Sequence, residues 1–166
     1  MIVVVDASVA VKWFLPGSPD EHHTEAALQL LEQSVLGLLP MVQPDHFVAE
    51  VAAVLARLKP DEAHKDLLDL LDIRFRTLAS PDIYATALDL AMRHQHHLFD
   101  TLYHAVALHT PDAVLITVMD GHPTALSWLG AVGSQKVTAL GVDSFGQSGD
   151  IEDLYRAVGI DTDSIL

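Results

Sequence analysis

The chain contains no cysteine, which excludes a disulfide framework and any metal site built from thiolates. It also has no apolar stretch approaching the roughly 18–20 residues that a membrane-spanning helix needs. The opening segment, Met1 to Asp6, has no basic residue, and Asp6 interrupts the apolar run too early for a secretory signal peptide. We therefore expect a soluble protein of the cytoplasm, a reducing compartment with which the lack of cysteine is compatible.

Positive charge is scarce as well. Only 9 Lys and Arg stand against 23 Asp and Glu, giving a formal net charge of −14. Proteins that hold nucleic acid through its phosphates usually present a basic surface, so this balance alone argues against an RNA substrate. Divalent cations bound among carboxylates would reverse the local sign, and a basic partner would cover acidic surface. The positive residues could also cluster; their densest stretch comprises Arg57, Lys59, Arg74 and Arg76.

Several catalytic signatures are also absent. The chain has no His-Glu-x-x-His, no Gly-rich phosphate loop and no Gly-x-Ser-x-Gly. Its 10 histidines suggest zinc, but the adjacent pairs His22-His23 and His96-His97 cannot point to one centre from a regular helix. No second Asp stands two residues after Asp6, which argues against a phosphotransferase of the haloacid-dehalogenase type.

The composition is that of a folded chain with a sizeable core, since half of the 166 residues are hydrophobic and 19% are charged. Short β-branched or alternating runs predict strands, and apolar residues at helical spacing predict helices between them. The expected strands cover residues 2–5, 73–78, 113–117 and 136–142. The expected helices cover residues 9–14, 18–31, 45–58, 59–71, 80–94, 98–109, 124–129 and 151–158. This alternation predicts an α/β fold of three layers, with a mostly parallel central sheet flanked by helices.

Four acidic residues stand where an apolar environment makes a charge costly. Asp6 ends a buried strand, Glu50 lies in an apolar helix, Asp100 opens a helix, and Asp120 follows a strand. Each has a simpler explanation. Asp6 and Asp100 would serve as helix caps, Glu50 would be a solvated helix position, and Asp120 would belong to a turn. In parallel sheets, however, functional sites lie beyond the carboxyl ends of the strands, where Asp6 and Asp120 are expected.

The segments around these acids resemble one family. Val3-Val-Val-Asp6-Ala-Ser8-Val-Ala-Val-Lys12-Trp-Phe14 is similar to the opening of PIN-domain ribonucleases, specifically the VapC-like toxins of prokaryotic toxin–antitoxin pairs. Pro44-Asp-His-Phe-Val-Ala-Glu50 looks like the family's second acidic motif, and Leu98-Phe-Asp100-Thr-Leu-Tyr103 looks like its third. The resemblance covers roughly residues 1 to 140. It implies a PIN-like nuclease domain at 1–142, followed by an acidic C-terminal appendage at 143–166.

Two positions depart from the family's wording. The fourth motif usually reads Thr-Ala-Asp, whereas this chain reads Thr117-Val-Met-Asp120, one residue longer, with Asp120 as the best counterpart. Ala53 stands where the family often has Asn.

The resemblance implies a divalent-metal-dependent endoribonuclease. Mg²⁺ and Mn²⁺ prefer hard oxygen ligands, and such ions activate water and neutralise charge on a phosphodiester. Asp6 and Asp100 would be the principal ligands, Glu50 a ligand or a base that positions water, and Asp120 would complete a second metal position. Carboxylates gathered in this way should raise the pKa of at least one of them. Ser8 would hold a ligand or phosphate oxygen, or cap a helix.

Further expectations concern neighbours of the site and partners. His104 lies one turn after Asp100, so it either supports the site or contacts substrate, or is an ordinary surface or core histidine. The resemblance also implies a homodimer silenced by a small antitoxin whose arginine enters the acidic groove. Two alternatives remain: a catalytically weak or inactive PIN-like binding module, and a metal-dependent phosphoesterase acting on DNA or small phosphate esters.

Overall fold

The computed structural model describes residues 1–16 and 24–117, and residues Met1–Thr117 belong to one compact unit. The strands in this part of the chain are short. They are β1 (Ile2–Val5), β2 (Val42–Gln43), β3 (Arg76–Thr77) and β4 (Ala113–Ile116). The β1–β4 and β2–β3 pairs are both parallel, and a parallel bridge between Val3 and Met41 joins β2 to β1. The spatial order is therefore β4-β1-β2-β3, and the predicted α/β fold with parallel strands is confirmed.

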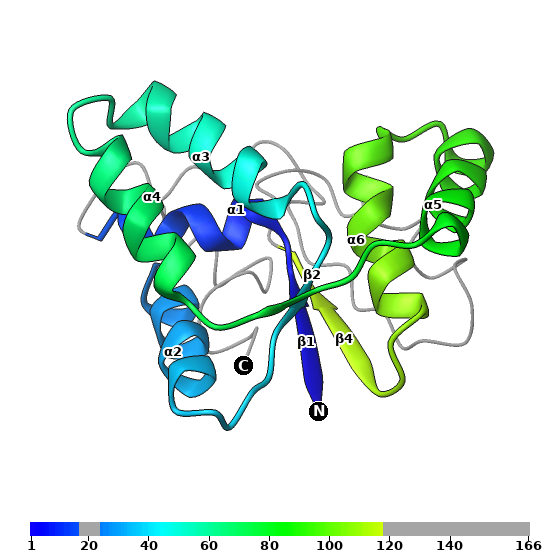
Figure 1. The fold of residues 1–166 in the computed structure, drawn as a ribbon, viewed down its shortest axis with the longest axis horizontal. Coiled ribbons are helices and arrows are strands. Elements are labelled where there is room, and N and C mark those ends of the chain that lie inside the picture. The colour runs from blue at the N-terminus through cyan, green and yellow to red at the C-terminus, as the bar shows by residue number, and fades with distance from the viewer. Residues whose placement is uncertain (17–23, 118–166) are drawn as a thin grey trace, which may run out of the picture. The chain divides into compact units, whose positions relative to one another are not determined.

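Helices form every connection between successive strands, as parallel pairing requires. They are α1 (Ala7–Ala10), the 3₁₀ helix η1 (Val11–Phe14), α2 (Thr24–Val35), α3 (Phe47–Leu58), α4 (Ala63–Asp72), α5 (Pro81–His94) and α6 (Leu98–Leu108). Figure 1 shows α1 to α4 on one side of the strands and α5 and α6 on the other. The strands thus form a middle layer between two layers of helices.

The core lies where these layers meet. Val3, Val4 and Val5 of β1 are completely buried, as the β-branched run predicts. From α3, Phe47, Val51 and Leu55 reach the same interior, each at 0% exposure. Their spacing of four residues places them on one face of the helix. Glu50 lies outside this spacing, so it sits at the edge of the buried face.

Helix α5 illustrates how local signals set an element's ends. Ser80 is its N-cap, and the Ser80 hydroxyl accepts a hydrogen bond of 3.2 Å from the Ile83 amide. Pro81 occupies the first turn, where its missing N–H costs nothing. Gln95 ends the helix in the left-handed conformation, with φ of 56°. The helix expected over residues 80–94 is therefore confirmed.

Two strands differ from expectation. The strand predicted over residues 73–78 is reduced to Arg76–Thr77, and both residues are exposed. Its partner β2 is itself only two residues long and ends at Gln43, so β3 has only two residues to pair with. The strand predicted as buried at 113–117 is only partly so, since Val114 is 44% exposed. Within the described residues, β4 pairs with β1 alone and is an edge strand.

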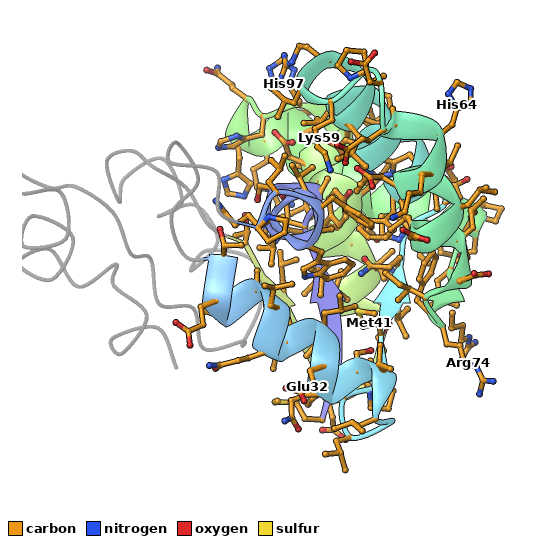
Figure 2. The ribbon with its side chains drawn as sticks, turned by 90° about the vertical axis from the view of Figure 1, so that its left-hand side faces the viewer. Glu32, Met41, Lys59, His64, Arg74 and His97 are labelled. Atoms are coloured by element: carbon orange, nitrogen blue, oxygen red, sulfur yellow. The ribbon has the colours of Figure 1, made fainter. Side chains whose placement is uncertain are left out.

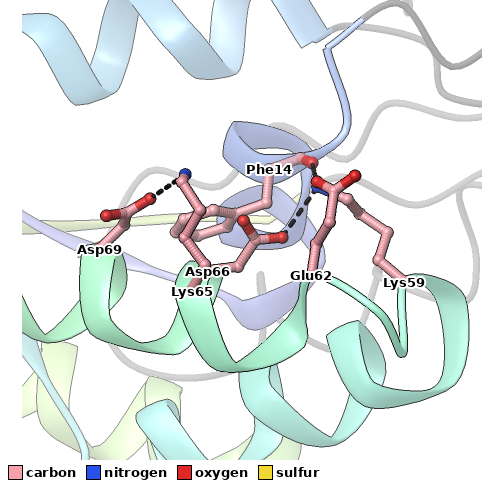
Figure 3. Close-up of polar contacts among 6 residues, drawn as sticks. All are labelled: Phe14, Lys59, Glu62, Lys65, Asp66 and Asp69. Atoms are coloured by element: carbon pink, nitrogen blue, oxygen red, sulfur yellow. Dashed lines mark hydrogen bonds and ion pairs between the residues drawn. The ribbon is translucent and has the colours of Figure 1, made fainter.

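A partly buried ion cluster fastens the α3–α4 hairpin to the end of η1 (Figure 3). The Lys59 ammonium donates to the Phe14 carbonyl at 2.8 Å and to Asp66 Oδ2 at 2.8 Å, and it lies 2.9 Å from Glu62 Oε2. The Asp66 side chain is only 5% exposed, whereas that of Lys59 is 23% exposed. All three donors of Lys59 are therefore engaged, and the charge of Asp66 is compensated inside the fold.

Some expectations fall outside the described residues. They concern the first residues, 18–23, of the helix expected over 18–31, whose remainder lies in α2. They also concern Asp120, the helices at 124–129 and 151–158, the strand at 136–142, and the boundary between 142 and 143. Among the residues that the structure describes, no helix is long and apolar enough to cross a membrane.

Candidate metal and nuclease site

Asp6 follows β1 directly and begins α1. Its carboxylate accepts a hydrogen bond of 2.8 Å from the Ser8 amide, so Asp6 is the N-cap of α1. The simpler interpretation of Asp6 as a helix cap is therefore correct. Burial raises the pKa of the Asp6 carboxyl; the hydrogen bond from Ser8 opposes this rise, and the charges of Glu50 and Asp100 add to it.

The strand end that carries Asp6 is held by the side chain of Gln43. Alternate residues of β1 face its two neighbours: the Val3 amide donates to Pro40 at 3.0 Å, and the Asp6 amide donates to Ile116 at 3.0 Å. Val5 faces β2, where the chain has already turned away at Pro44. With its amide oriented to satisfy both groups, Gln43 donates to the Val5 carbonyl at 3.0 Å and accepts from the Val5 amide at 3.2 Å. Gln43 is completely buried.

Glu50 lies in the first turn of α3. Its Oε2 accepts a hydrogen bond of 2.8 Å from the Tyr103 hydroxyl and lies 3.4 Å from Nε2 of His46. The Glu50 side chain is 35% exposed. The contact with His46 lowers the pKa of Glu50, burial opposes this, and the Tyr103 hydrogen bond lowers it further. Glu50 is thus a fixed, ionised carboxylate at the rim of the core, and more than a solvated helix position.

Asp100 lies in the first turn of α6. The N-cap of this helix is His97, so the interpretation of Asp100 as a cap is wrong. Burial raises the pKa of the Asp100 carboxyl, and the charge of Glu50 raises it further, while His97, His96 and His46 act in the opposite direction. Asp100 is thus a half-buried carboxyl that is not a helix cap and is repelled by the charge of Glu50, which makes it a candidate for binding a cation.

The structure brings three of the four acids into one electrostatic neighbourhood. The negative charges of Glu50 and Asp100 raise the pKa of Asp6, and the charge of Glu50 raises the pKa of Asp100. The expected rise in pKa is found at both aspartates, although burial contributes more than the neighbouring charges do. Asp120 lies outside the described residues. Whether these four residues are metal ligands stays a prediction.

The donor set fits Mg²⁺ or Mn²⁺ in its chemistry. Carboxylate oxygens are the ligands that these ions prefer, and Mg²⁺ in particular is often bound by one or two carboxylates while it keeps several waters. Within residues 1–16 and 24–117, no three His, Asp or Glu side chains lie close enough to hold one ion together. The fit of the described acids to these ions therefore rests on the chemistry of their oxygen donors.

His104 is shielded from water, which lowers its pKa to about 3, and the nearby His96 and His94 lower it further. It is therefore neutral at physiological pH. A neutral, largely buried ring matches the simpler expectation of an ordinary core histidine, and a contact between His104 and substrate stays untested.

The stretch with the densest positive charge does not bring Lys59 and Arg74 together. Lys59 and Arg74 lie well apart in Figure 2. The ammonium of Lys59 is also already paired with the carboxylates of Asp66 and Glu62.

Three supporting residues were missed from the sequence: Gln43, His46 and Tyr103. Two of them had a readable signal. His46 precedes Glu50 by four residues, and Tyr103 follows Asp100 by three, so each shares a helical face with an acid. Gln43 had none, because its role depends on where β2 turns away from β1.

With this geometry in view, the chain can be compared with known proteins. It matches the PIN domain family over residues 3–122, which is most of the chain. The chain belongs to the PIN domain family, so this part of the resemblance is confirmed. Its fold is similar to that of VapC20 from Mycobacterium tuberculosis, described as a toxin that cleaves the sarcin–ricin loop. The TM-score is 0.56 at 17% identity, covering 82% of this chain and 98% of that one. No protein of curated function matches the chain significantly in sequence.

Proposed function

We propose that this chain is a divalent-metal-dependent endoribonuclease and the toxin of a toxin–antitoxin pair. The family supports a nuclease, and the similarity in fold to a ribonuclease toxin supports RNA as the substrate. The observation that supports it most is the placement of Asp6, Glu50 and Asp100. They come from three separate elements, and neighbouring negative charges raise the pKa of each aspartate.

The residues would divide the chemistry as follows. Asp6 and Asp100 would bind Mg²⁺ or Mn²⁺, and Glu50 would bind the ion or orient the attacking water. Asp120 would complete a second metal position. When bound, the ion supplies an activated water and neutralises charge on the scissile phosphate. Since the raised pKa values of Asp6 and Asp100 show that their charges are costly, a cation is a favourable partner for both.

The direct test is cleavage of an RNA panel with Mg²⁺, Mn²⁺ or EDTA, with DNA and small phosphate esters as alternative substrates. The proposal expects RNA cleavage with metal and none with EDTA. Preferred turnover of DNA or of small esters would instead identify a phosphoesterase of another kind.

A second candidate is a PIN-like binding module with weak or no cleavage. It is favoured by the lack of a three-residue metal cluster among the described residues. This candidate expects RNA binding without metal-dependent products in the same panel.

The proposed partners follow from the toxin assignment. We expect a homodimer in the cytoplasm that binds a small antitoxin, whose arginine would enter the acidic site. With a net charge of −14, the chain should attract a basic partner at a rate that falls as salt rises. Co-expression with any small protein encoded beside this one, followed by light scattering and cleavage assays, tests this. A monomer whose activity ignores that neighbour would contradict the toxin assignment while leaving a stand-alone nuclease.

A further inference from the structure

Two side chains contact the same oxygen of Glu50, Tyr103 through a hydrogen bond and His46 through a longer approach of its ring nitrogen. The Tyr103 hydroxyl donates to Oε2 at 2.8 Å, and His46 Nε2 lies 3.4 Å from the same atom. Oε1 takes part in neither contact. Because an ionised carboxylate accepts through both oxygens, this arrangement leaves Oε1 for another ligand.

The two holding side chains are themselves fixed by packing. Tyr103 is 1% exposed. The ring of His46 lies between two rings of α6, with centroids 5.0 Å from Tyr103 and 5.1 Å from Phe99. Both ring nitrogens of His46 are buried, and neither has a hydrogen-bond partner among the described residues. The contact with Glu50 is therefore the place where a buried nitrogen of His46 can meet an acceptor.

Glu50 does not require these two contacts to obtain hydrogen bonds. With 35% of its side chain exposed, Glu50 could be hydrated without a protein partner. Fixing a flexible glutamate costs side-chain entropy. The bond also spans 53 positions in sequence and ties α3 to the turn of α6 that follows Asp100. Its effect is to define where the carboxylate of Glu50 points relative to Asp100.

We infer that Tyr103 and His46 are positioning residues, which hold Glu50 by Oε2 and direct Oε1 toward the space that Glu50 shares with Asp6 and Asp100. This inference rests on the proposed metal-dependent cleavage and names two residues on which that reaction depends. Neither residue touches the substrate or the ion; both act through Glu50.

The test uses Tyr103→Phe, which removes one buried oxygen and keeps the ring. Tyr84→Phe is the matched control, because the Tyr84 hydroxyl also donates to a carboxylate, Asp45 Oδ2 at 2.6 Å, but holds none of the candidate site acids. Contacts that orient metal ligands typically contribute about 10- to 100-fold to affinity or activity. We expect kcat of Tyr103→Phe to fall by that factor with KM for RNA nearly unchanged. The Mn²⁺ concentration giving half of the thermal stabilisation should rise by about tenfold.

Two further measurements separate positioning from packing. His46→Phe keeps the stacked ring but removes the nitrogen, and it should shift the Mn²⁺ midpoint in the same direction as Tyr103→Phe. In a Glu50→Gln background, Tyr103→Phe should cause no further loss of cleavage or Mn²⁺ response, because it acts only through Glu50.

The outcomes are distinct. A metal-responsive, active wild type whose Tyr103→Phe variant matches Tyr84→Phe in kcat and Mn²⁺ midpoint would overturn this inference alone. So would a loss that persists fully in the Glu50→Gln background, or one that merely follows a lower melting temperature without metal. A wild type that neither cleaves RNA nor responds to Mn²⁺ would overturn the proposed function, and this inference with it.

Discussion

The ion cluster around Lys59 allows a stability prediction with an internal control. Lys59→Met removes the ammonium from Asp66, whose side chain is 5% exposed, and from the carbonyl of Phe14. The neighbouring Lys65 forms an ion pair of nearly equal length with Asp69, 2.7 Å against 2.8 Å for Lys59 and Asp66 (Figure 3). This pair lies in solvent, since the side chain of Lys65 is 75% exposed and that of Asp69 is 52% exposed. The same substitution at Lys65 therefore tests the same chemistry without burial.

The magnitude follows from what each variant leaves behind. Removing one partner of a buried ion pair typically costs about 3–5 kcal/mol, because the remaining charge stays buried. Lys59 keeps 23% of its side chain exposed, so water can partly replace it, and we expect the lower end, roughly 3 kcal/mol. Glu62, at 64% exposure, is rehydrated without cost. For a chain of this size, this corresponds to a fall in melting temperature of roughly 6–12 °C.

The assay is urea and thermal unfolding of both variants, followed by circular dichroism. Lys65→Met should be indistinguishable from wild type, because exposed pairs contribute little. Lys59→Met/Asp66→Leu should recover most of the loss, since no buried charge remains. If Lys59→Met were as stable as Lys65→Met, the ion cluster would not fasten the hairpin to η1, and the reasoning from the burial of Asp66 would be refuted.

Three further predictions concern the site. Asp100→Asn should raise the melting temperature of the metal-free protein at neutral pH, because it removes a charge that burial and Glu50 disfavour; an unchanged or lower value would contradict this. Folding raises the pKa values of Asp6 and Asp100, so the folded state binds the protons of these two carboxyls more tightly than the unfolded state does. Without metal, their contribution to the free energy of unfolding should therefore fall as pH rises from about 3.8 through their pKa values in the folded state. Urea titrations at several pH values should show this decrease in wild type and not in the Asp6→Asn/Asp100→Asn variant, whereas Glu50 acts with the opposite sign in both. Gln43→Leu should cost about 2–4 kcal/mol in urea unfolding, because it strands the buried amide and carbonyl of Val5; a smaller loss than that of an exposed Gln→Leu control would contradict the assigned amide orientation.

Much of this fold is determined by residues close together in the sequence. The β-branched run before Asp6 predicts a buried strand, and its three valines are at 0% exposure. Ser80 and Pro81 mark the start of α5 through a cap and a residue without an amide hydrogen, both of which act within one turn. The three described acids stand in apolar segments, but it was the resemblance of these segments to PIN-domain motifs that joined the acids into one expected site.

What sequence reasoning missed depends on partners far away in the chain. The length of β3 is limited by its partner β2, which ends at Gln43, more than 30 residues earlier in the chain. The bond from Tyr103 to Glu50 needs α3 and α6 to be placed side by side. Lys59 looked like part of a basic cluster because its partners in the folded chain, Asp66 and the carbonyl of Phe14, cannot be read from its neighbours.

The central claim is that Asp6, Glu50 and Asp100 form a metal-dependent site for RNA cleavage. The most direct measurement is RNA cleavage by wild type, Asp6→Asn and Asp100→Asn across a Mn²⁺ titration, with the Mn²⁺-dependent melting temperature recorded on the same samples. We predict that wild type cleaves RNA only with metal and is stabilised by it. Both variants should stay folded and lose cleavage by at least about a hundredfold, together with the stabilisation. Metal-independent cleavage, or variants that respond to Mn²⁺ as wild type does, would contradict the claim.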